Sequence, residues 1–139
     1  MRKDMYSHIS ILPVVAPAAN SNLGTTPLVG TVIDRKGFEA LTYAIITGTL
    51  SDVDATYTVL LEESDLPSSA FAAVADADML GTEAAAGFTF ANDGVTRKLG
   101  YIGSKRYTRL TITPAAADSG NSPVAAIAIL GMAHLGPVA

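Results

Sequence analysis

The sequence contains no cysteine, which excludes disulfide bonds and thiolate metal sites and leaves packing or assembly as the source of stability. Tryptophan is also absent, and the aromatic residues are five tyrosines and four phenylalanines. Sugar-binding clefts are normally lined with aromatic side chains. The composition therefore argues against a carbohydrate site, although it does not remove that alternative.

Charge is scarce as well. Charged residues make up 16% of the chain, against about 25% in ordinary soluble domains, while 49% of the residues are hydrophobic and the mean hydropathy is +0.34. The net charge is -4, and neither sign forms a long block, which argues against direct binding to nucleic acid or to an anionic membrane. A surface so short of charge either exposes many small residues or is covered in part by partner protein.

Long apolar runs are missing too. The most apolar segment, Val124 to Leu130, is far shorter than the roughly 20 residues of a membrane-spanning helix. Met1 to Ser10 carries Arg2, Lys3 and Asp4 with no apolar stretch behind them, so it does not resemble a signal peptide. We therefore expect one domain, made in the cytoplasm and without a membrane span.

Short apolar and β-branched runs alternate with Gly, Pro, Asn and Asp clusters along the chain, which is typical of an all-β domain. Leu28 to Ile33 and Phe38 to Gly48 are expected to pair as a hairpin around a turn at residues 34–37, where Gly37 can supply a positive φ. The second of these strands and the run Val124 to Leu130 are apolar on both faces, so we expect both faces to be covered. The other expected strands are Tyr57 to Glu62, Phe88 to Phe90, Val95 to Ile102 and Tyr107 to Thr113, and the alanine stretches 84–86 and 115–117 are expected to be loop edges.

Seven or eight short strands predict an antiparallel two-sheet sandwich, with jelly-roll or immunoglobulin-like connectivity. The body spans residues 27–130, between an N-terminal arm or first strand at 1–26 and a C-terminal tail at 131–139. The first segment either pairs with the sheet edge of a neighbouring molecule or forms the first strand of its own domain. In the first case it contributes to an interface the apolar residues Ile9, Ile11, Leu12, Val14 and Val15.

No residue pattern points to catalysis, a metal or a cofactor. His8 and His134 lie at opposite ends of the sequence, with no nucleophile motif beside them. The pairs Asp52/Asp54 and Asp76/Asp78 lack the further ligands of a calcium loop, so we interpret them as turn-forming residues. We expect no enzymatic activity.

The basic residues gather in one stretch of the sequence. They either meet an acidic partner surface or form a solvated face of two neighbouring strands. The residues concerned are Arg97, Lys98, Lys105, Arg106 and Arg109.

Three segments carry a resemblance to a known family. They are Ile33 to Thr42 (IDRKGFEALT), Tyr57 to Ser64 (YTVLLEES) and Val95 to Tyr107 (VTRKLGYIGSKRY). In this order they resemble capsid cement, or decoration, proteins of tailed bacteriophages, and the likeness runs from about Leu28 to Leu130. The resemblance implies a jelly-roll fold and a homodimer on the capsid exterior, with the major capsid protein as its partner.

The leading hypothesis is a structural virion protein that cements adjacent major capsid protein subunits and stabilises the head against internal DNA pressure. Two alternatives remain: a structural component of the tail, neck or baseplate, and a carbohydrate-binding jelly-roll module. Under the leading hypothesis the basic residues and the first segment are the interface candidates.

Overall fold

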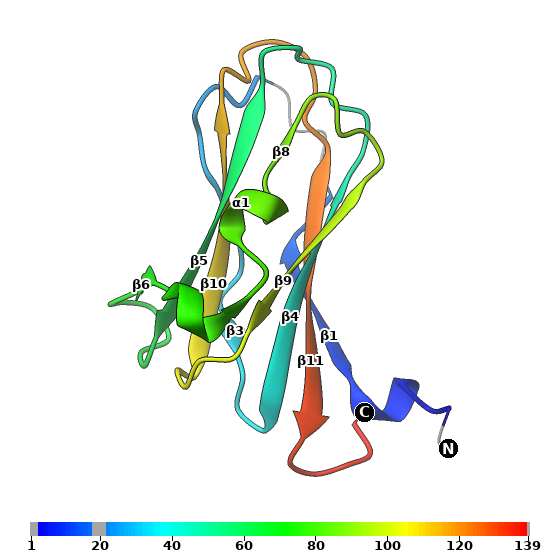
Figure 1. Ribbon diagram of the computed structural model, residues 1–139, viewed down its shortest axis with the longest axis vertical. Coiled ribbons are helices and arrows are strands. Elements are labelled where there is room, and N and C mark those ends of the chain that lie inside the picture. The colour runs from blue at the N-terminus through cyan, green and yellow to red at the C-terminus, as the bar shows by residue number, and fades with distance from the viewer. Residues whose placement is uncertain (1–2, 18–21, 139) are drawn as a thin grey trace.

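The protein is a sandwich of two antiparallel sheets (Figure 1). The computed structural model describes residues 3–17 and 22–138. Within them, the five-stranded sheet has the order β1-β11-β4-β9-β7, and the six-stranded sheet has the order β2-β10-β5-β6, with β3 also pairing with β10 and β8 with β5. The strands are β1 (Ser10–Val15), β2 (Leu28–Val29), β3 (Ile33–Asp34), β4 (Phe38–Thr47), β5 (Thr56–Ser64), β6 (Ala72–Ala73), β7 (Met79–Leu80), β8 (Phe88–Thr89), β9 (Thr96–Tyr101), β10 (Tyr107–Ala115) and β11 (Val124–Ala133), and the helical turns are η1 (Tyr6–His8), η2 (Asp76–Asp78) and α1 (Glu83–Ala86).

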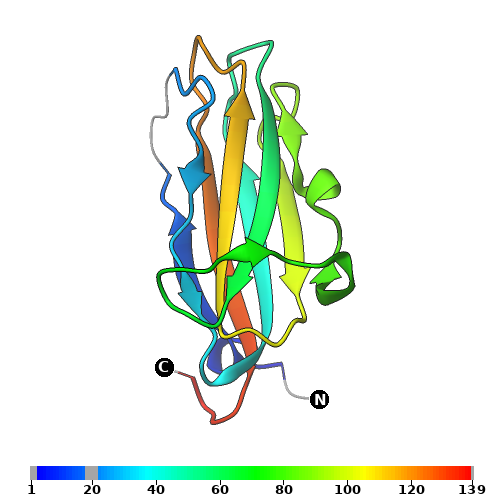
Figure 2. The same ribbon diagram turned by 90° about the vertical axis from the view of Figure 1, so that its left-hand side faces the viewer.

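Successive long strands lie in opposite sheets, as Figure 2 shows from the side. The chain passes from β1 to β2 and β3 in the other sheet, returns to β4, crosses to β5, and alternates again through β9, β10 and β11. The first and last long strands, β1 and β11, are neighbours. This alternation is jelly-roll connectivity, and the predicted antiparallel sandwich is confirmed.

The core lies between the sheets and is formed by alternate residues of each long strand. Tyr43, Leu99 and Leu110 are fully buried there. A polar contact also joins the layers, since the Tyr43 hydroxyl on β4 lies 2.6 Å from the Thr108 hydroxyl on β10. Burial of this phenol raises the pKa of Tyr43, because the charged form would lose its hydration.

The expected hairpin over residues 28–48 is wrong. Gly37 does adopt φ +90°, and Asp34 accepts a hydrogen bond from the Lys36 amide as a turn residue should. However, β3 pairs with β10 in the six-stranded sheet while β4 belongs to the five-stranded sheet. The segment is therefore a corner between sheets, because alternation and turn residues reveal strands but not their partners.

The alanine stretch 84–86, expected to be a loop edge, instead belongs to the short helix α1. Thr82 caps this helix by accepting a hydrogen bond from the Ala85 amide at 3.0 Å, and Ala86 is buried against the core. The Glu83 side chain accepts a hydrogen bond from the Leu61 amide at 2.7 Å, so the helix covers part of the outer edge of β5.

The first segment forms strand β1 of this chain's own five-stranded sheet, paired with β11. Val14 is 4% exposed, and its carbonyl accepts a hydrogen bond from the Thr31 amide at 2.9 Å. At the other end, β11 continues three residues beyond Leu130 to Ala133.

Candidate interaction surface

One face of the sandwich is apolar and open. The residues of the five-stranded sheet that point away from the core form this surface, which we call the outer face. They alternate with buried residues such as Leu41, Leu99 and Leu130. The outer face consists of Ile11 and Pro13 on β1, Ala125, Ile127, Ile129 and Gly131 on β11, Ala40, Thr42, Ala44 and Ile46 on β4, Thr96, Lys98 and Gly100 on β9, and Leu80 on β7.

Several large apolar side chains of the outer face are exposed. Ile11 is 55% exposed, Ile46 53%, Leu80 58% and Ile127 38%. Lys98 is the one ionisable residue among those that form this face. The two strands that were expected to be covered on both sides, β4 and β11, are thus covered on one side only within the chain.

Large and small side chains alternate across the outer face. Along the paired strands β11 and β4, Ile127 lies beside Ala44, Ile129 beside Thr42, and Ile46 beside Ala125. Leu80 lies beside Gly100 at the far edge of the sheet. Two hollows lie between the larger side chains. One of about 230 Å³ lies beside Ile46, Thr96 and Ile127, and one of about 240 Å³ lies beside Thr42, Leu80 and Gly100.

The outer side of the six-stranded sheet differs in character. It carries threonines at positions 58 and 113, which face each other across β5 and β10. Beside them Arg109 donates to the Glu62 carboxylate from both Nε and Nη2, at 2.9 and 2.7 Å, and its guanidinium lies 4.4 Å from the centre of the Phe71 ring. Leu60 and Val29 are also exposed on that side, but threonines and an ion pair lie beside them, so it is more polar than the outer face.

The structure divides the basic residues of the sequence between the two sheets. The expectation of one face on two neighbouring strands is wrong, because β9, with Arg97 and Lys98, and β10, with Arg109, belong to different sheets. Lys105 and Arg106 lie in the connection between these strands.

Three of these cations also have carboxylate partners within the chain: Lys105 with Asp65, Arg106 with Asp34 and Arg109 with Glu62. The Arg106 guanidinium lowers the pKa of Asp34 through the hydrogen bonds that it donates. The local concentration of positive charge is therefore largely neutralised. Lys98 is the member of this group that stands on the outer face.

The apolar candidates of the first segment divide in the same way. Ile11 lies on the outer face. Ile9 lies two residues earlier, just before β1, so the alternation of side chains along a strand gives it the same orientation. Leu12 and Val14 point to the opposite side and face the core, although Leu12 is 36% exposed at the sheet edge. Val15 follows a register irregularity and packs against the core.

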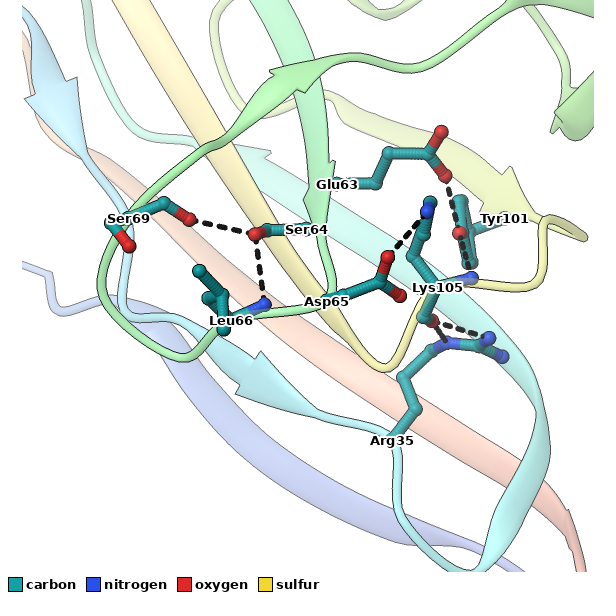
Figure 3. Close-up of polar contacts among 8 residues, drawn as sticks. All are labelled: Arg35, Glu63, Ser64, Asp65, Leu66, Ser69, Tyr101 and Lys105. Atoms are coloured by element: carbon teal, nitrogen blue, oxygen red, sulfur yellow. Dashed lines mark hydrogen bonds and ion pairs between the residues drawn. The ribbon is translucent and has the colours of Figure 1, made fainter.

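Figure 3 shows a polar cluster at the corner between the sheets that the sequence did not reveal. Arg35 is 9% exposed and donates hydrogen bonds to the carbonyl of Lys105 at 2.7 and 2.9 Å and to that of Gly103 at 3.0 Å. Its guanidinium lies 4.6 Å from the centre of the Tyr101 ring. This arginine therefore fixes the β9–β10 connection to the start of β4.

Tyr101 extends the corner cluster. Its hydroxyl donates to Glu63 on β5 and accepts from the Lys105 amide at 2.9 Å (Figure 3). Burial raises the pKa of Tyr101, and the hydrogen bond to the Glu63 carboxylate raises it further. The cluster links strands of both sheets, and each polar group in it is used internally. We assign it to the fold rather than to a ligand.

The histidines and aspartates singled out in the sequence do not gather into a metal site. Over residues 3–17 and 22–138, no three His, Asp or Glu residues are placed to hold a metal ion. Asp52 accepts hydrogen bonds from the amides of Asp54 and Ser119, which is the structural role expected of a turn aspartate. His134 pairs with Glu39 on the surface.

The aromatic residues do not gather at one exposed place. Tyr43, Tyr57, Tyr101 and Phe88 are buried, and Phe88 stacks on Tyr57 with ring centres 4.6 Å apart. In addition, no helix in the described part of the chain is long and apolar enough to cross a membrane.

No protein-family model matches the sequence, and no curated protein does so either. Solved structures with the same fold include the exported protein XepA of PBSX, with 17% identity and a TM-score of 0.55 over 91% of this chain and 38% of that chain. A structure of infectious bursal disease virus, Gx strain, has 8% identity and a TM-score of 0.50 over 90% of this chain and 32% of that one. A chain of the Ralstonia phage GP4 capsid has 10% identity and a TM-score of 0.48 over 91% and 84%.

This chain spans less than two fifths of the length of the first two structures. At these identities the comparisons establish the β-sandwich fold, and they leave activity and partners to be inferred from the surface itself.

Proposed function

We propose that the chain is a structural protein of a tailed-phage particle, which binds the outside of the head and cements adjacent major capsid protein subunits. The observation that carries the proposal is the open apolar outer face. A soluble monomer rarely leaves a contiguous apolar patch of this kind uncovered, whereas subunits of assemblies bury such patches against one another.

Two further observations support a place in a virus particle. The segments Ile33 to Thr42, Tyr57 to Ser64 and Val95 to Tyr107 resemble phage capsid cement proteins. The fold is shared with a protein of PBSX and with a protein of a virus particle. In this proposal the chain is made in the host cytoplasm and then joins the capsid exterior.

We propose further that two copies pair through their outer faces. A two-fold axis between two such faces, parallel to the strands and above the gap between β11 and β4, places β11 of each copy over β4 of the other. Ile127 of one copy then meets Ala44 of the other, and Ile46 meets Ala125. This arrangement is self-complementary, as a two-fold interface requires. Lys98 then lies near the rim, where its ammonium can stay hydrated.

The size of the outer face suits such a pairing. With strands about 4.8 Å apart and about 3.3 Å per residue, β1, β11, β4 and β9 cover a footprint of about 500 Å². Two such footprints together give about 1,000 Å², which is the lower limit expected of a specific interface. The outer face is therefore large enough to support the proposed pairing.

The dimer is tested by placing a charge on the outer face. Ile127→Lys should convert the dimer to a monomer in light scattering after size exclusion, since the ammonium would be buried without a partner. Leu60→Lys is the matched control, because Leu60 on the opposite side of the sandwich is 37% exposed, close to the 38% of Ile127. A wild-type chain that is monomeric at every concentration would refute the pairing.

The virion assignment is tested on particles. Purified chain is added to phage heads that lack it, and bound copies are located by cryo-electron microscopy. We expect density on the capsid exterior between major capsid subunits, and heads that withstand higher temperatures before releasing DNA. Density only on the tail, neck or baseplate would refute the capsid location and identify the chain as a component of that structure. Absence of binding to particles would refute the proposal as a whole.

A further inference from the structure

The end of the sandwich at which both chain termini lie carries a second apolar surface (Figures 1 and 2). We call it the terminal end, formed by residues 4–8, 36–39 and 132–138. Met5 is 68% exposed, Tyr6 86%, Met132 72% and Leu135 87%. These are the four highest exposures among the large apolar side chains in the described part of the protein.

Hydrogen bonds hold the segments that carry these side chains. The Ser7 amide donates to the Asp4 carboxylate at 3.0 Å, and the Ser7 carbonyl accepts from the Val138 amide at 2.9 Å. The His134 amide donates to the Gly37 carbonyl at 2.8 Å. The two ends of the chain are thus fastened to each other and to the start of β4. A surface organised in this way loses less conformational entropy on binding than a free tail does.

The terminal end also contains a hollow. Its volume is about 360 Å³, and its apolar lining comes from Phe38, Ala133, Leu135 and Val138. The exposed Lys36 and His134 complete the lining. Protruding and recessed apolar groups therefore lie at the same end of the molecule. A protein surface of complementary shape can pack closely against such groups.

Met132 adds an observation of a different kind. It has a φ of +51°, in the left-handed region that favours glycine over residues with a Cβ. This unfavourable backbone holds a 72% exposed methionine near the end of β11. Asn22, Ala70 and Ala116 have a similar φ elsewhere, so at Met132 the backbone sets the direction in which the side chain protrudes and the exposure carries the argument.

The charges of the terminal end favour a protein partner over a lipid surface. Among the residues that form it, Lys36 is opposed by Asp4 and Glu39, with His8 and His134 beside them. Loops that insert apolar side chains into membranes are usually surrounded by an excess of cations that attract anionic lipid. These residues carry no such excess of cations. The partner that fits them is therefore a folded protein whose apolar surface is surrounded by charges of both signs.

We propose that the terminal end docks on an apolar surface of a capsid subunit, which inserts a side chain into the hollow and receives Tyr6 and Leu135. This inference rests on the proposed function and names its capsid-binding surface. A two-fold axis parallel to the strands leaves both terminal ends of a dimer pointing in the same direction. One dimer then contacts two capsid subunits, and each contact raises the effective concentration of the other.

The test uses the double variant Tyr6→Ser/Leu135→Ser of the full chain. Both side chains are almost fully exposed, so the fold and the dimer should be unchanged in circular dichroism and light scattering. We expect the concentration for half-occupancy of capsids to rise at least tenfold. Val53→Ser is the matched control, since Val53 is 65% exposed in the loop between β4 and β5 at the opposite end, and its binding should equal that of the wild type.

The possible results separate the two proposals. Wild-type chain that does not bind capsids refutes the proposed function and this inference with it. Equal binding by the wild type and the double variant refutes this inference alone. Binding of the wild type to phosphatidylcholine/phosphatidylglycerol vesicles that is lost in the double variant, with capsid binding unchanged, would assign the terminal end to lipid instead.

Discussion

Replacing Arg35 with methionine would measure how strongly the corner between the sheets depends on one buried cation. The guanidinium bonds the Lys105 carbonyl twice, the Gly103 carbonyl once and the Glu39 carbonyl at 3.3 Å, and it covers the Tyr101 ring. Methionine fills part of the space but donates no hydrogen bond, so these partly buried carbonyls lose their partner.

The expected loss of stability is about 3 kcal/mol. Hydrogen bonds to charged groups contribute about 1.5–3 kcal/mol each, and an arginine over an aromatic ring about 0.5–2 kcal/mol. These contributions do not add, because the bonds share one side chain whose desolvation already costs free energy. Methionine also recovers some packing, which keeps the net loss below the sum.

Urea unfolding followed by circular dichroism would measure the effect. With a slope of about 1.5–2 kcal/mol per molar, a loss of about 3 kcal/mol moves the midpoint down by about 1.5–2 M. The wild type and variants must be compared at one protein concentration, because pairing of copies adds to apparent stability. Lys36→Met, at the exposed neighbouring position, should change the free energy by less than about 0.5 kcal/mol. An Arg35→Met loss below about 1 kcal/mol would show that the corner is held by packing instead.

Three further predictions concern the fold. Gly30→Ala should destabilise by about 1–3 kcal/mol in the same urea assay, since the new Cβ would lie 2.5 Å from the Leu110 carbonyl oxygen; a neutral effect would show that the backbone yields. Wild-type stability should fall as pH rises above about 10, the pKa of an unfolded tyrosine, because the folded pKa of Tyr101 is raised, and Tyr101→Phe should reduce that fall. Arg106 lowers the pKa of Asp34 in the folded protein, so this carboxylate stabilises the fold above about pH 4, the pKa of an unfolded aspartate. That stabilisation should be lost as pH falls through the folded pKa of Asp34, and Asp34→Asn should therefore make stability depend less on pH in acid.

The strands could be predicted from the sequence because their pattern is local. Alternating burial follows directly from the two-residue period, as in β5, where Tyr57, Val59 and Leu61 are buried between exposed neighbours. Strand partners are not local. The turn at residues 34–37 has the composition of a hairpin turn, yet it leads from one sheet to the other, and nothing in the pattern distinguishes the two outcomes.

The outer face, the interaction surface that we propose, could be predicted only in part. Ile11 and Lys98 were candidates, and both lie on the outer face. Ile46 and Ile127 were expected to be buried, because their strands were expected to be covered on both faces, and Leu80 was not singled out. Arg35 was missed because a buried arginine in a turn has no signature in sequence. The basic residues were grouped by proximity in sequence, whereas the crossing between β9 and β10 separates them.

The error about β4 and β11 is informative in itself. Their sequences are apolar on both faces, and a strand of this kind is stable in water only when both faces are covered. The sandwich covers the inner faces of β4 and β11 and leaves Ile46 and Ile127 on the outer side exposed. Since β5 and β10, in the same fold, carry threonines and an ion pair on their outer side, the jelly roll does not itself demand an apolar exterior. In the dimer that we propose, a second copy supplies the cover that the sequence of β4 and β11 predicts, because the two-fold axis sets Ile127 and Ile46 against the small residues Ala44 and Ala125.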